Sequence, residues 1–360
     1  MLNLRNLTLE ELKELAIKLG EPSYRGEQIF HWITCKEALS FWEMTDLPKT
    51  LRKRLSEEFS LALPEIIETK IDVDGTTKFA LKLQDGEIIE TVIIPERDHF
   101  TLCVSTQVGC PLGCKFCLTA KMGFKRNLEV YEIISQVVLA RRYLKEKGEE
   151  LPLRNIVFMG MGEPLLNLKN LIKALKILAH PKGFNYSKKR LTVSTAGLVK
   201  EMEELAKTFP TALAVSLHAP TDEIRRSLMP IARKYSIKEI ISACKRFPRI
   251  KRGRTTIEYI LIKDINDTPY CAHKLAELLK GFPFKVNLIP FNPHPELPFE
   301  RPSQERIEKF QKILLSHGIL TTVRKSKGLG IEAACGQLRA KVVKDSSPDS
   351  VNKETAIRTC

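Results

Sequence analysis

Long apolar runs are absent from this 360-residue sequence. No stretch approaches the roughly 20 apolar residues that a membrane-spanning helix requires. The opening residues, MLNLRNLTLEELKEL, contain neither the apolar core nor the small-residue cleavage site of a secretion signal. We therefore expect a cytoplasmic protein that has no membrane partner.

The sequence also lacks the even number of cysteines that is typical of secreted disulfide-bonded proteins, because it has nine. In a reducing compartment such cysteines more often bind metal or carry out redox chemistry. Three of them, Cys110, Cys114 and Cys117, lie in the glycine-containing loop QVGCPLGCKFC. Their Cys-x3-Cys-x2-Cys spacing brings three thiolates to one side of a tight turn.

A fourth cysteine or histidine does not follow this loop at the spacing of a structural zinc site, which needs four ligands. Three thiolates suit three corners of a [4Fe-4S] cluster instead, and the fourth iron can then bind a substrate or cofactor directly. Zinc and ordinary core cysteines are the two alternatives that the loop leaves open.

Acidic residues are outnumbered, with 43 Asp and Glu against 58 Lys and Arg, so the formal net charge is +15. Such an excess favours a polyanion partner, because each neutralised phosphate releases condensed counterions. Basic runs occur at residues 51–54, 188–190 and 245–254, and Phe247 in the last run could stack on a base or anchor the loop. The alternative is a generally basic surface that keeps the chain in solution.

The first 65 residues are typical of small helices. Thr8 and Glu11 form a capping-box pattern ahead of apolar residues at helical spacing, and Asp46 with Pro48 could begin a further short helix. Residues 66–100 have a strand-like pattern instead of a helical one. TKFALKL and IIETVII flank the turn-like QDGE, and this arrangement predicts paired strands. We expect residues 1–65 to form a helical accessory domain and residues 66–100 a β-hairpin-like extension.

From residue 101 to residue 340, apolar β-branched runs alternate with segments of helical period. The six runs are TLCVSTQV, RNIVFM, RLTVSTA, TALAVSL, RTTIEYILI and KVNLIPF. This rhythm predicts an α/β domain whose parallel sheet has helices outside it and is closed or partly closed as a barrel. Chemistry then belongs to the loops after the strands, and the three-cysteine loop follows the first. The polar residues 341–360 are typical of a disordered tail.

Polar residues lie at the ends of four other predicted strands. The stretch MGMGEPLLN places Gly162 and Glu163 where glycine backbone and a carboxylate could contact the ammonium of an amino-acid cofactor. The alternative is that this stretch is an ordinary strand-to-helix loop. The remaining strand ends carry Ser194, Ser216, His218 and Asn292. A lone histidine is more often a partner of the backbone than a ligand, but together these residues point to one rim of the barrel.

The cysteine spacing, with the aromatic Phe116 just before the third thiol, resembles the signature of the radical S-adenosylmethionine (SAM) superfamily. This resemblance implies a [4Fe-4S] cluster on Cys110, Cys114 and Cys117, whose open iron chelates SAM and whose electron cleaves it to a 5'-deoxyadenosyl radical. A partial (β/α)6 barrel is implied as well. The resemblance further implies that SAM is held by Gly162, Glu163, Ser194, Ser216, Leu217, His218 and Asn292.

A more specific resemblance rests on TLCVSTQVGCPLGCKFC, MGMGEPLLN, VSLHAP and AACGQL, together with FHWI and EMTDLPKTLRKRL nearer the start. These motifs are similar to those of the RlmN family of dual-specificity RNA adenine-C2 methyltransferases. The resemblance implies 23S rRNA and tRNA as partners, two SAM molecules per turnover and an external flavodoxin- or ferredoxin-like electron donor. It also suggests that the helical domain of residues 1–65 helps to bind RNA, and we expect a monomer.

Three further residues receive roles from the same resemblance. Cys335 would carry the methyl group as S-methylcysteine, and Cys103 would form a transient disulfide with it. Glu90 would accept the C2 proton, a role that the Cys103 thiolate could also fill. Taken alone, either cysteine could be buried and inert, although the glycines around Cys335 favour a mobile loop.

Two other functions compete with this prediction. A Cfr-like enzyme shares the cluster and the cysteine pair but methylates adenine C8, and MGMGEPLLN with EMTDLPK favours RlmN over it. A non-catalytic iron–sulfur or zinc protein that binds RNA is the alternative from another class. That protein would keep its function after Cys335→Ala or Cys103→Ala, whereas the enzyme would lose turnover.

Overall fold

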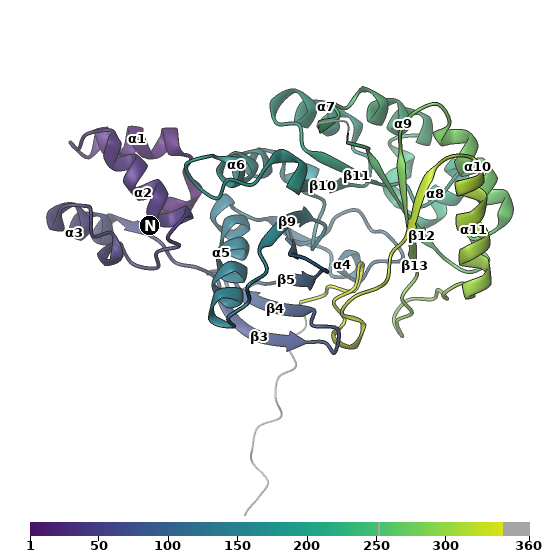
Figure 1. Cartoon of the computed structure of the whole chain (residues 1–360), viewed down its shortest axis with the longest axis horizontal. Coiled ribbons are helices and arrows are strands. Elements are labelled where there is room, and N and C mark those ends of the chain that lie inside the picture. The colour runs from purple at the N-terminus through teal and green to yellow at the C-terminus, as the bar shows by residue number, and fades with distance from the viewer. Residues whose placement is uncertain (251–252, 341–360) are drawn as a thin grey trace, which may run out of the picture.

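A ten-stranded mixed sheet organises the computed structural model, which describes residues 1–250 and 253–340 (Figure 1). The predicted tail, residues 341–360, lies outside the described residues. The sheet runs in the order β14-β13-β12-β11-β10-β9-β6-β5-β4-β3. Its strands are β3 (Glu65–Ile71), β4 (Thr77–Lys82), β5 (Ile88–Pro95), β6 (Phe100–Cys103), β9 (Leu153–Phe158), β10 (Leu191–Thr195), β11 (Ala212–Ser216), β12 (Thr256–Leu261), β13 (Lys285–Pro290) and β14 (Leu320–Val323).

Seven consecutive strands of this sheet, from β6 to β14 along its order, pair in parallel. Six of them correspond to the six apolar runs, so the predicted parallel α/β core is confirmed, and β14 adds a seventh. Within the described ranges no pairing joins β14 to β3, so the sheet stays open and the barrel is partial. The helices between the strands are α5 (Val130–Glu146), α6 (Leu168–Ala179), α7 (Val199–Thr208), α8 (Asp222–Leu228), α9 (Ile237–Arg246), α10 (Pro269–Leu279) and α11 (Gln304–Ser316).

Apolar faces of these helices cover the sheet, as the periodicity predicted. In α5, Ile133, Val137 and Val138 have no measurable exposure, and Phe310 and Leu314 are buried in α11. Full burial of each such side chain contributes roughly 1.5–3 kcal/mol, so the helix packing is a large part of what keeps the strands aligned. Figure 1 shows α7, α9, α10 and α11 outside the strands.

The first apolar run, TLCVSTQV, is not one strand as predicted. Strand β6 ends at Cys103, and the chain leaves the sheet to form the small antiparallel hairpin of β7 (Gln107–Gly109) and β8 (Phe124–Asn127). The amide of Val104 still donates to Val157 in β9, but the Val104 carbonyl accepts from Gly160 and the Thr106 amide donates to Met161, so the chain bonds to the turn after β9 from there on. This hairpin carries the three-cysteine loop.

The extension of residues 66–100 joins the main sheet. It forms three antiparallel strands, β3 to β5, and β5 pairs with β6 through Val92 opposite Cys103. The central strand is largely buried, with Phe79 and Leu81 at no exposure. The extension therefore continues the sheet beyond its parallel part and is more than a single hairpin.

The N-terminal helices are α1 (Leu9–Lys18), α2 (Tyr24–Thr34) and α3 (Lys49–Glu58), beside a two-stranded pair of β1 (Leu2–Asn3) and β2 (Phe59–Ser60). The capping box of Thr8 and Glu11 is confirmed, with the Glu11 amide 3.3 Å from the Thr8 hydroxyl. In Figure 1, α1 and α2 lie beside α6, and Lys173 of α6 pairs with Glu11 of α1 at 2.7 Å. No helix in the described part of the chain is long and apolar enough to cross a membrane.

Candidate active site

A large cavity, with an empty volume of about 1140 Å³ that includes its open mouth, lies at the carboxyl ends of the parallel strands. The carboxyl edge is where parallel sheets of this kind bind ligands. The sequence-predicted residues that line it are Cys103, Cys110, Cys114, Cys117, Gly162, Glu163, Ser194, Ser216, His218 and Cys335. The structure therefore brings together residues from β6, the first strand of the parallel part, and from the segment after β14, the last.

The hairpin of β7 and β8 holds the cysteine loop at its base. The amide of Cys110 donates to the carbonyl of Gly123, 2.9 Å away, and so closes the loop. Gly109 has φ +74°, and a Cβ there would lie 1.8 Å from the Gly123 carbonyl oxygen. Only glycine fits this position, which explains why glycine precedes the first thiol of the loop.

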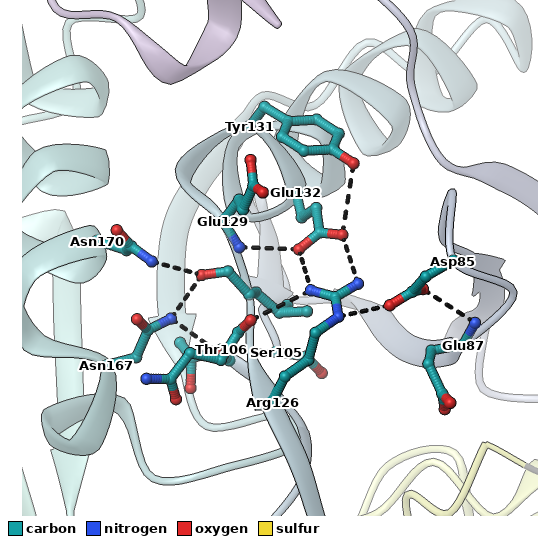
Figure 2. Close-up of polar contacts among 12 residues, drawn as sticks. Asp85, Glu87, Ser105, Thr106, Arg126, Glu129, Tyr131, Glu132, Asn167 and Asn170 are labelled. Carbon is teal, nitrogen blue, oxygen red and sulfur yellow. Dashed lines mark hydrogen bonds and ion pairs between the residues drawn. The ribbon is translucent and has the colours of Figure 1, made fainter. Parts of the chain in front are cut away.

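A partly buried network fastens β8 to the body of the protein (Figure 2). The Arg126 guanidinium donates two hydrogen bonds to the Glu132 carboxylate, at 2.8 and 2.9 Å, and a third to Asp85 at 2.6 Å. Asn167 donates to the carbonyls of Thr106 and Leu128. Paired arginine–carboxylate bonds of this kind are directional, so they fix the stem of the cysteine loop against α5 and against the β4–β5 turn.

The three thiols of the loop suit an iron–sulfur cluster as a donor set. Burial raises the pKa of Cys114 well above its usual range, and the charges of Cys117 and Cys110 raise it further, as neighbouring thiols do. Bound iron would offset this cost, because thiolate is the form that binds metal. No three described histidine, cysteine or acidic side chains converge on one point as ligands of a single ion do. A four-iron cube needs no such convergence, because each thiolate binds a different corner.

The turn of Gly162 and Glu163 follows β9 and faces the cysteine loop. Gly162 has φ +99°, and the amide of Glu163 donates to the side-chain oxygen of Gln107 at 2.8 Å. The Glu163 carboxylate accepts from the amides of Leu165 and Ala196. Burial raises the pKa of Glu163 to about 7 despite these bonds. None of the ion pairs found among the described residues involves this carboxylate.

The ends of β10 and β11 present Ser194, Ser216 and His218 to the cavity. His218 has φ +61°, and its Nδ1 accepts from the amide of Ile260 at 3.0 Å, so a backbone partner satisfies this histidine as the sequence suggested. Burial lowers its pKa to about 3, which leaves the ring neutral. The fully buried Arg225 ties these strand ends together, because its guanidinium donates to the carbonyls of Leu217, Ala196 and Ser216.

Two predicted SAM residues lie outside the lining of the main cavity. Leu217 is fully buried, in keeping with a packing role. Asn292 lines a smaller adjoining cavity that also contains Cys335 and Arg324, and its side-chain oxygen accepts from Ser326 at 2.7 Å. Asn292 is therefore close to the same site, but on the far side of the segment that carries Cys335.

Cys103 and Cys335 line the main cavity beside the cysteine loop. Burial raises the pKa of Cys103 to about 12, and the nearby charge of Cys335 contributes to the rise. Arg324 lies beside both, since the charges of Cys335, Glu258 and Cys103 all raise its pKa. The arrangement places two free thiols and a cation at one wall of the cavity.

Glu90 is not in the lining of this cavity as the structure describes it. Its side chain is 1% exposed and pairs with Lys78, with 3.0 Å between nitrogen and oxygen. Its second oxygen accepts from the amide of Arg339 at 2.9 Å. Glu90 therefore lies beneath the segment that carries Cys335 rather than in the open space.

Two family descriptions match parts of the chain. Residues 104–273 match the radical SAM superfamily, and residues 2–61 match the ribosomal RNA large subunit methyltransferase N-terminal domain. The dual-specificity RNA methyltransferase RlmN of Solidesulfovibrio magneticus is 47% identical over 341 residues, which cover 95% of this chain and 97% of that protein. The chain belongs to the RlmN family. The RlmN of Geobacter sulfurreducens is also 47% identical, over 95% of this chain and 93% of its own length.

A solved structure agrees with this RlmN assignment. A radical SAM methyltransferase from Sphaerobacter thermophilus superposes with a TM-score of 0.90 at 47% identity, covering 95% of this chain and all of that one. The radical SAM fold predicted from the cysteine signature is therefore confirmed over nearly the whole chain. Both cofactors that define the superfamily, SAM and a [4Fe-4S] cluster, follow from this membership.

The basic runs lie on different parts of this RlmN-family chain. Residues 51–54 are in α3, residues 188–190 form a short 3-10 helix before β10, and residues 251–252 of the third run lie outside the described residues. Phe247 is 4% exposed and so anchors the loop instead of being available to stack on a base. Lys53 remains accessible on α3, with its side chain 70% exposed.

Several residues of the site gave no signal in the sequence. Gln107 orients the turn of Glu163, Arg225 ties two strand ends together, and Arg324 stands beside the two thiols. Gln107 begins β7, Arg324 directly follows β14 and Arg225 lies in α8, and no local motif distinguishes any of them from a surface residue. Their burial could have been suspected only from their position at the carboxyl edge of the predicted sheet.

Proposed function

We propose that this chain methylates C2 of adenine in RNA through a methyl group carried on Cys335, using two SAM molecules per turnover. The observation that carries the proposal is that Cys103 and Cys335 line the same cavity as the three-cysteine loop. Cys103 ends β6 and Cys335 follows β14, so the two thiols are far apart in the sequence. Neither belongs to the three-cysteine loop that would bind the cluster. Family membership supports the same chemistry, since the relatives are RNA methyltransferases.

A thiol is needed because adenine C2 is electron-poor and does not attack the methyl group of SAM. The Cys335 sulfur is a far better nucleophile once deprotonated, and it takes the methyl group as a thioether. The residues proposed to hold SAM for both uses are Gly162, Glu163, Ser194, Ser216, Leu217, His218 and Asn292. Glu163 would then gain in the SAM ammonium the cationic partner that its buried carboxylate lacks.

When bound on Cys110, Cys114 and Cys117, the cluster supplies the electron that turns a second SAM into a radical able to remove hydrogen from the Cys335 methyl group. The resulting carbon radical on Cys335 would add to C2, and the adduct would lose the C2 proton and one electron, which leaves Cys335 joined to the RNA through a methylene thioether. Cys103 then releases the RNA: its sulfur bonds to the Cys335 sulfur as the carbon–sulfur bond to the RNA breaks, and a proton completes the new methyl group. The two thiols are thereby oxidised to a disulfide, and an external reductant must return two electrons. Cys103 lines the cavity and Glu90 does not, which favours Cys103 over Glu90 as acceptor of the C2 proton.

The substrates we propose are 23S rRNA and tRNA. Bases are reached by such a cavity only when they are unstacked, so the target adenosine would be splayed out of its helix. The helices of residues 1–65 would grip the folded RNA; deleting them should weaken RNA binding, and unchanged affinity would refute this part. We also propose a flavodoxin- or ferredoxin-like electron donor, a cytoplasmic location and a monomer.

The decisive experiment reconstitutes the cluster anaerobically, adds reductant, SAM and RNA, and analyses the digested nucleosides by mass spectrometry. We expect 2-methyladenosine, and its loss in both Cys335→Ala and Cys103→Ala. Finding 8-methyladenosine would instead identify Cfr-like chemistry. Finding neither nucleoside while the cluster is intact and reduced would defeat the proposal.

A further inference from the structure

Two parts of this chain lie outside both family matches and contact each other. One is the β3–β4 hairpin, and the other is the segment of residues 328–340 that carries Cys335. In Figure 1 this segment, in yellow, lies beside the ends of the extension strands. The contact is made by backbone amides of the segment and carboxylates of the hairpin turn.

Asp72 and Asp74 each use their two carboxylate oxygens for different purposes. One oxygen of each stabilises the hairpin turn, accepting from the amides of Val73 at 2.8 Å and Thr76 at 2.9 Å. The other oxygen reaches across the fold: Asp72 Oδ2 accepts from the amide of Gly330 at 3.2 Å and Asp74 Oδ2 from Gly328 at 3.1 Å. The turn therefore holds the start of the Cys335 segment through its main chain.

The glycines of the segment fit tightly against this turn. A Cβ at Gly328 would lie 2.9 Å from Cγ2 of Thr76, and one at Gly330 would lie 2.9 Å from Oδ1 of Asp72. Gly328 also has φ +67°, where other residues are strained. These glycines thus give the segment the close approach that its bonds to the hairpin need, and they do not make it loose.

Lys78 and its partner Glu90 attach the extension strands to the Cys335 segment at two points, one before and one after Cys335 in the chain. Its ammonium donates to the carbonyl of Glu332 at 3.2 Å and pairs with Glu90, whose other oxygen accepts from the amide of Arg339. The Lys78 and Glu90 side chains are 5% and 1% exposed. Removing one member of a buried pair leaves an uncompensated charge, so the pair is a firm anchor.

The opposite side of the segment is attached to the cluster loop. The amide of Leu118 donates to the carbonyl of Gly336 at 2.8 Å, and the Thr119 hydroxyl donates to the carbonyl of Leu338 at 2.6 Å. Both donors begin α4 (Leu118–Lys121), directly after Cys117. Cys335 is thus held between the hairpin and the cluster loop, at the wall that Cys103 also lines.

We infer that Asp72, Asp74 and Lys78 are positioning residues that hold Cys335 opposite Cys103. The inference deepens the proposed function and rests on it for the use of the two thiols. It predicts that weakening the hairpin contact lowers the effective concentration of the Cys335 thiol relative to Cys103 in disulfide formation. Effective concentration depends on how closely the two reacting groups are held in the right orientation.

The test compares the thiol–disulfide equilibrium of three full-length chains in anaerobic glutathione buffers, without SAM or RNA. The linked Cys103–Cys335 peptide is quantified by mass spectrometry. In the double variant Asp72→Asn, Asp74→Asn, each side-chain oxygen can still accept the hydrogen bond within the turn. The NH2 group then faces the amide of Gly330 or Gly328, and two donors cannot form a hydrogen bond. We expect its Cys103–Cys335 effective concentration to fall on the order of tenfold, the effect of losing about two ordinary hydrogen bonds.

The matched control is Glu65→Gln, Glu68→Gln, which removes the same charge from β3 of the same hairpin. This control should keep the wild-type equilibrium. Amide hydrogen exchange provides a second measurement: residues 333–338 should exchange faster in the aspartate variant, while the parallel strands stay protected. An unchanged disulfide equilibrium in a folded aspartate variant would overturn the inference.

If the aspartate variant does not fold, the double variant Lys78→Met, Glu90→Gln replaces it, because it removes the anchor without leaving a buried charge. A lowered effective concentration supports the inference, and a wild-type value overturns it. The result is independent of methylation, so a failure of the proposed enzyme activity would leave this measurement intact and distinguishable.

Discussion

The carboxylate of Glu163 accepts a hydrogen bond from the amide of Ala196, with 2.8 Å between oxygen and nitrogen. The two residues follow the neighbouring strands β9 and β10, so the bond joins two strand ends at the cavity. It also fixes a buried negative group where a cationic ligand would compensate it. The position of this carboxylate is therefore set by the sheet before any ligand binds.

Glu163→Gln should weaken SAM binding by roughly ten- to a hundredfold, because a charge-assisted hydrogen bond contributes about 1.5–3 kcal/mol. Isothermal titration of SAM into the cluster-loaded protein measures the change. Glu203→Gln, on the outer helix α7 where Glu203 pairs with Arg246, is the control and should bind SAM normally. Equal affinity in wild type and Glu163→Gln would remove Glu163 from the cofactor site.

Gly109→Ala should prevent the cysteine loop from closing, since the added Cβ would lie 1.8 Å from the Gly123 carbonyl oxygen. We expect the iron and sulfide content after reconstitution to fall to less than about half, with destabilisation of more than about 1–3 kcal/mol from backbone strain and collision together. Gly123→Ala is a matched control, because Gly123 has φ +73° but no atom within 4 Å of the added carbon. If both variants load iron equally, the closing contact does not shape the cluster site.

Arg324→Met should slow formation of the Cys103–Cys335 disulfide by roughly tenfold at fixed pH. Burial raises the pKa of Cys103 to about 12, and the Arg324 cation opposes that rise, so losing the cation leaves less of the reactive thiolate. Stopped alkylation followed by peptide mass analysis gives the rate. The exposed neighbour Lys325→Met removes the same charge and should react as the wild type does; a similar slowing in both would point to a general charge effect.

Acid should loosen the N-terminal helices before it unfolds the sheet. Hydrogen bonds from Lys13 and Lys182 lower the pKa of Glu27 to about 2, and these bonds link α1 and α2 to the chain after α6. A lowered folded-state pKa contributes stability above the unfolded value of 4.5, and this contribution is lost as pH falls from there towards 2. Protection of α1 and α2 against hydrogen exchange should therefore drop at pH 3 relative to pH 6.

The Glu27→Gln variant provides the comparison for this pH effect. It should show weak protection of the same helices at both pH values, and high salt should reduce the difference in the wild type, because these charges are exposed and screened. Equal protection of α1 and α2 in the wild type at the two pH values would contradict the prediction.

Local patterns predicted much of the fold because their causes are local. The capping box of Thr8 and Glu11 formed as expected, and the six apolar runs became parallel strands. The run TLCVSTQV misled because the Val104 carbonyl and the Thr106 amide bond to Gly160 and Met161, in the turn beyond β9, instead of extending β6. That competition depends on a strand some fifty residues away, which no window around the run contains.

The site was predictable only where a motif is compact. The spacing of Cys110, Cys114 and Cys117 in the sequence is sufficient to predict a cluster loop. The position of Cys103 and Cys335 at one wall of the cavity depends instead on the assembly of the whole sheet. Asn292 lies in the adjoining cavity because Cys335 and its neighbours occupy the space between. The burial of Glu90 with Lys78 follows from strand pairing between β4 and β5, which sets Ala80 opposite Glu90.

The last wall of the cavity is supplied by residues 324–338, near the end of the described chain. This segment follows every strand of the sheet along the chain, and it bonds to the residues directly after Cys117. The cavity is therefore complete only when the Cys335 segment packs against the cysteine loop, and access to the loop from this side depends on that attachment.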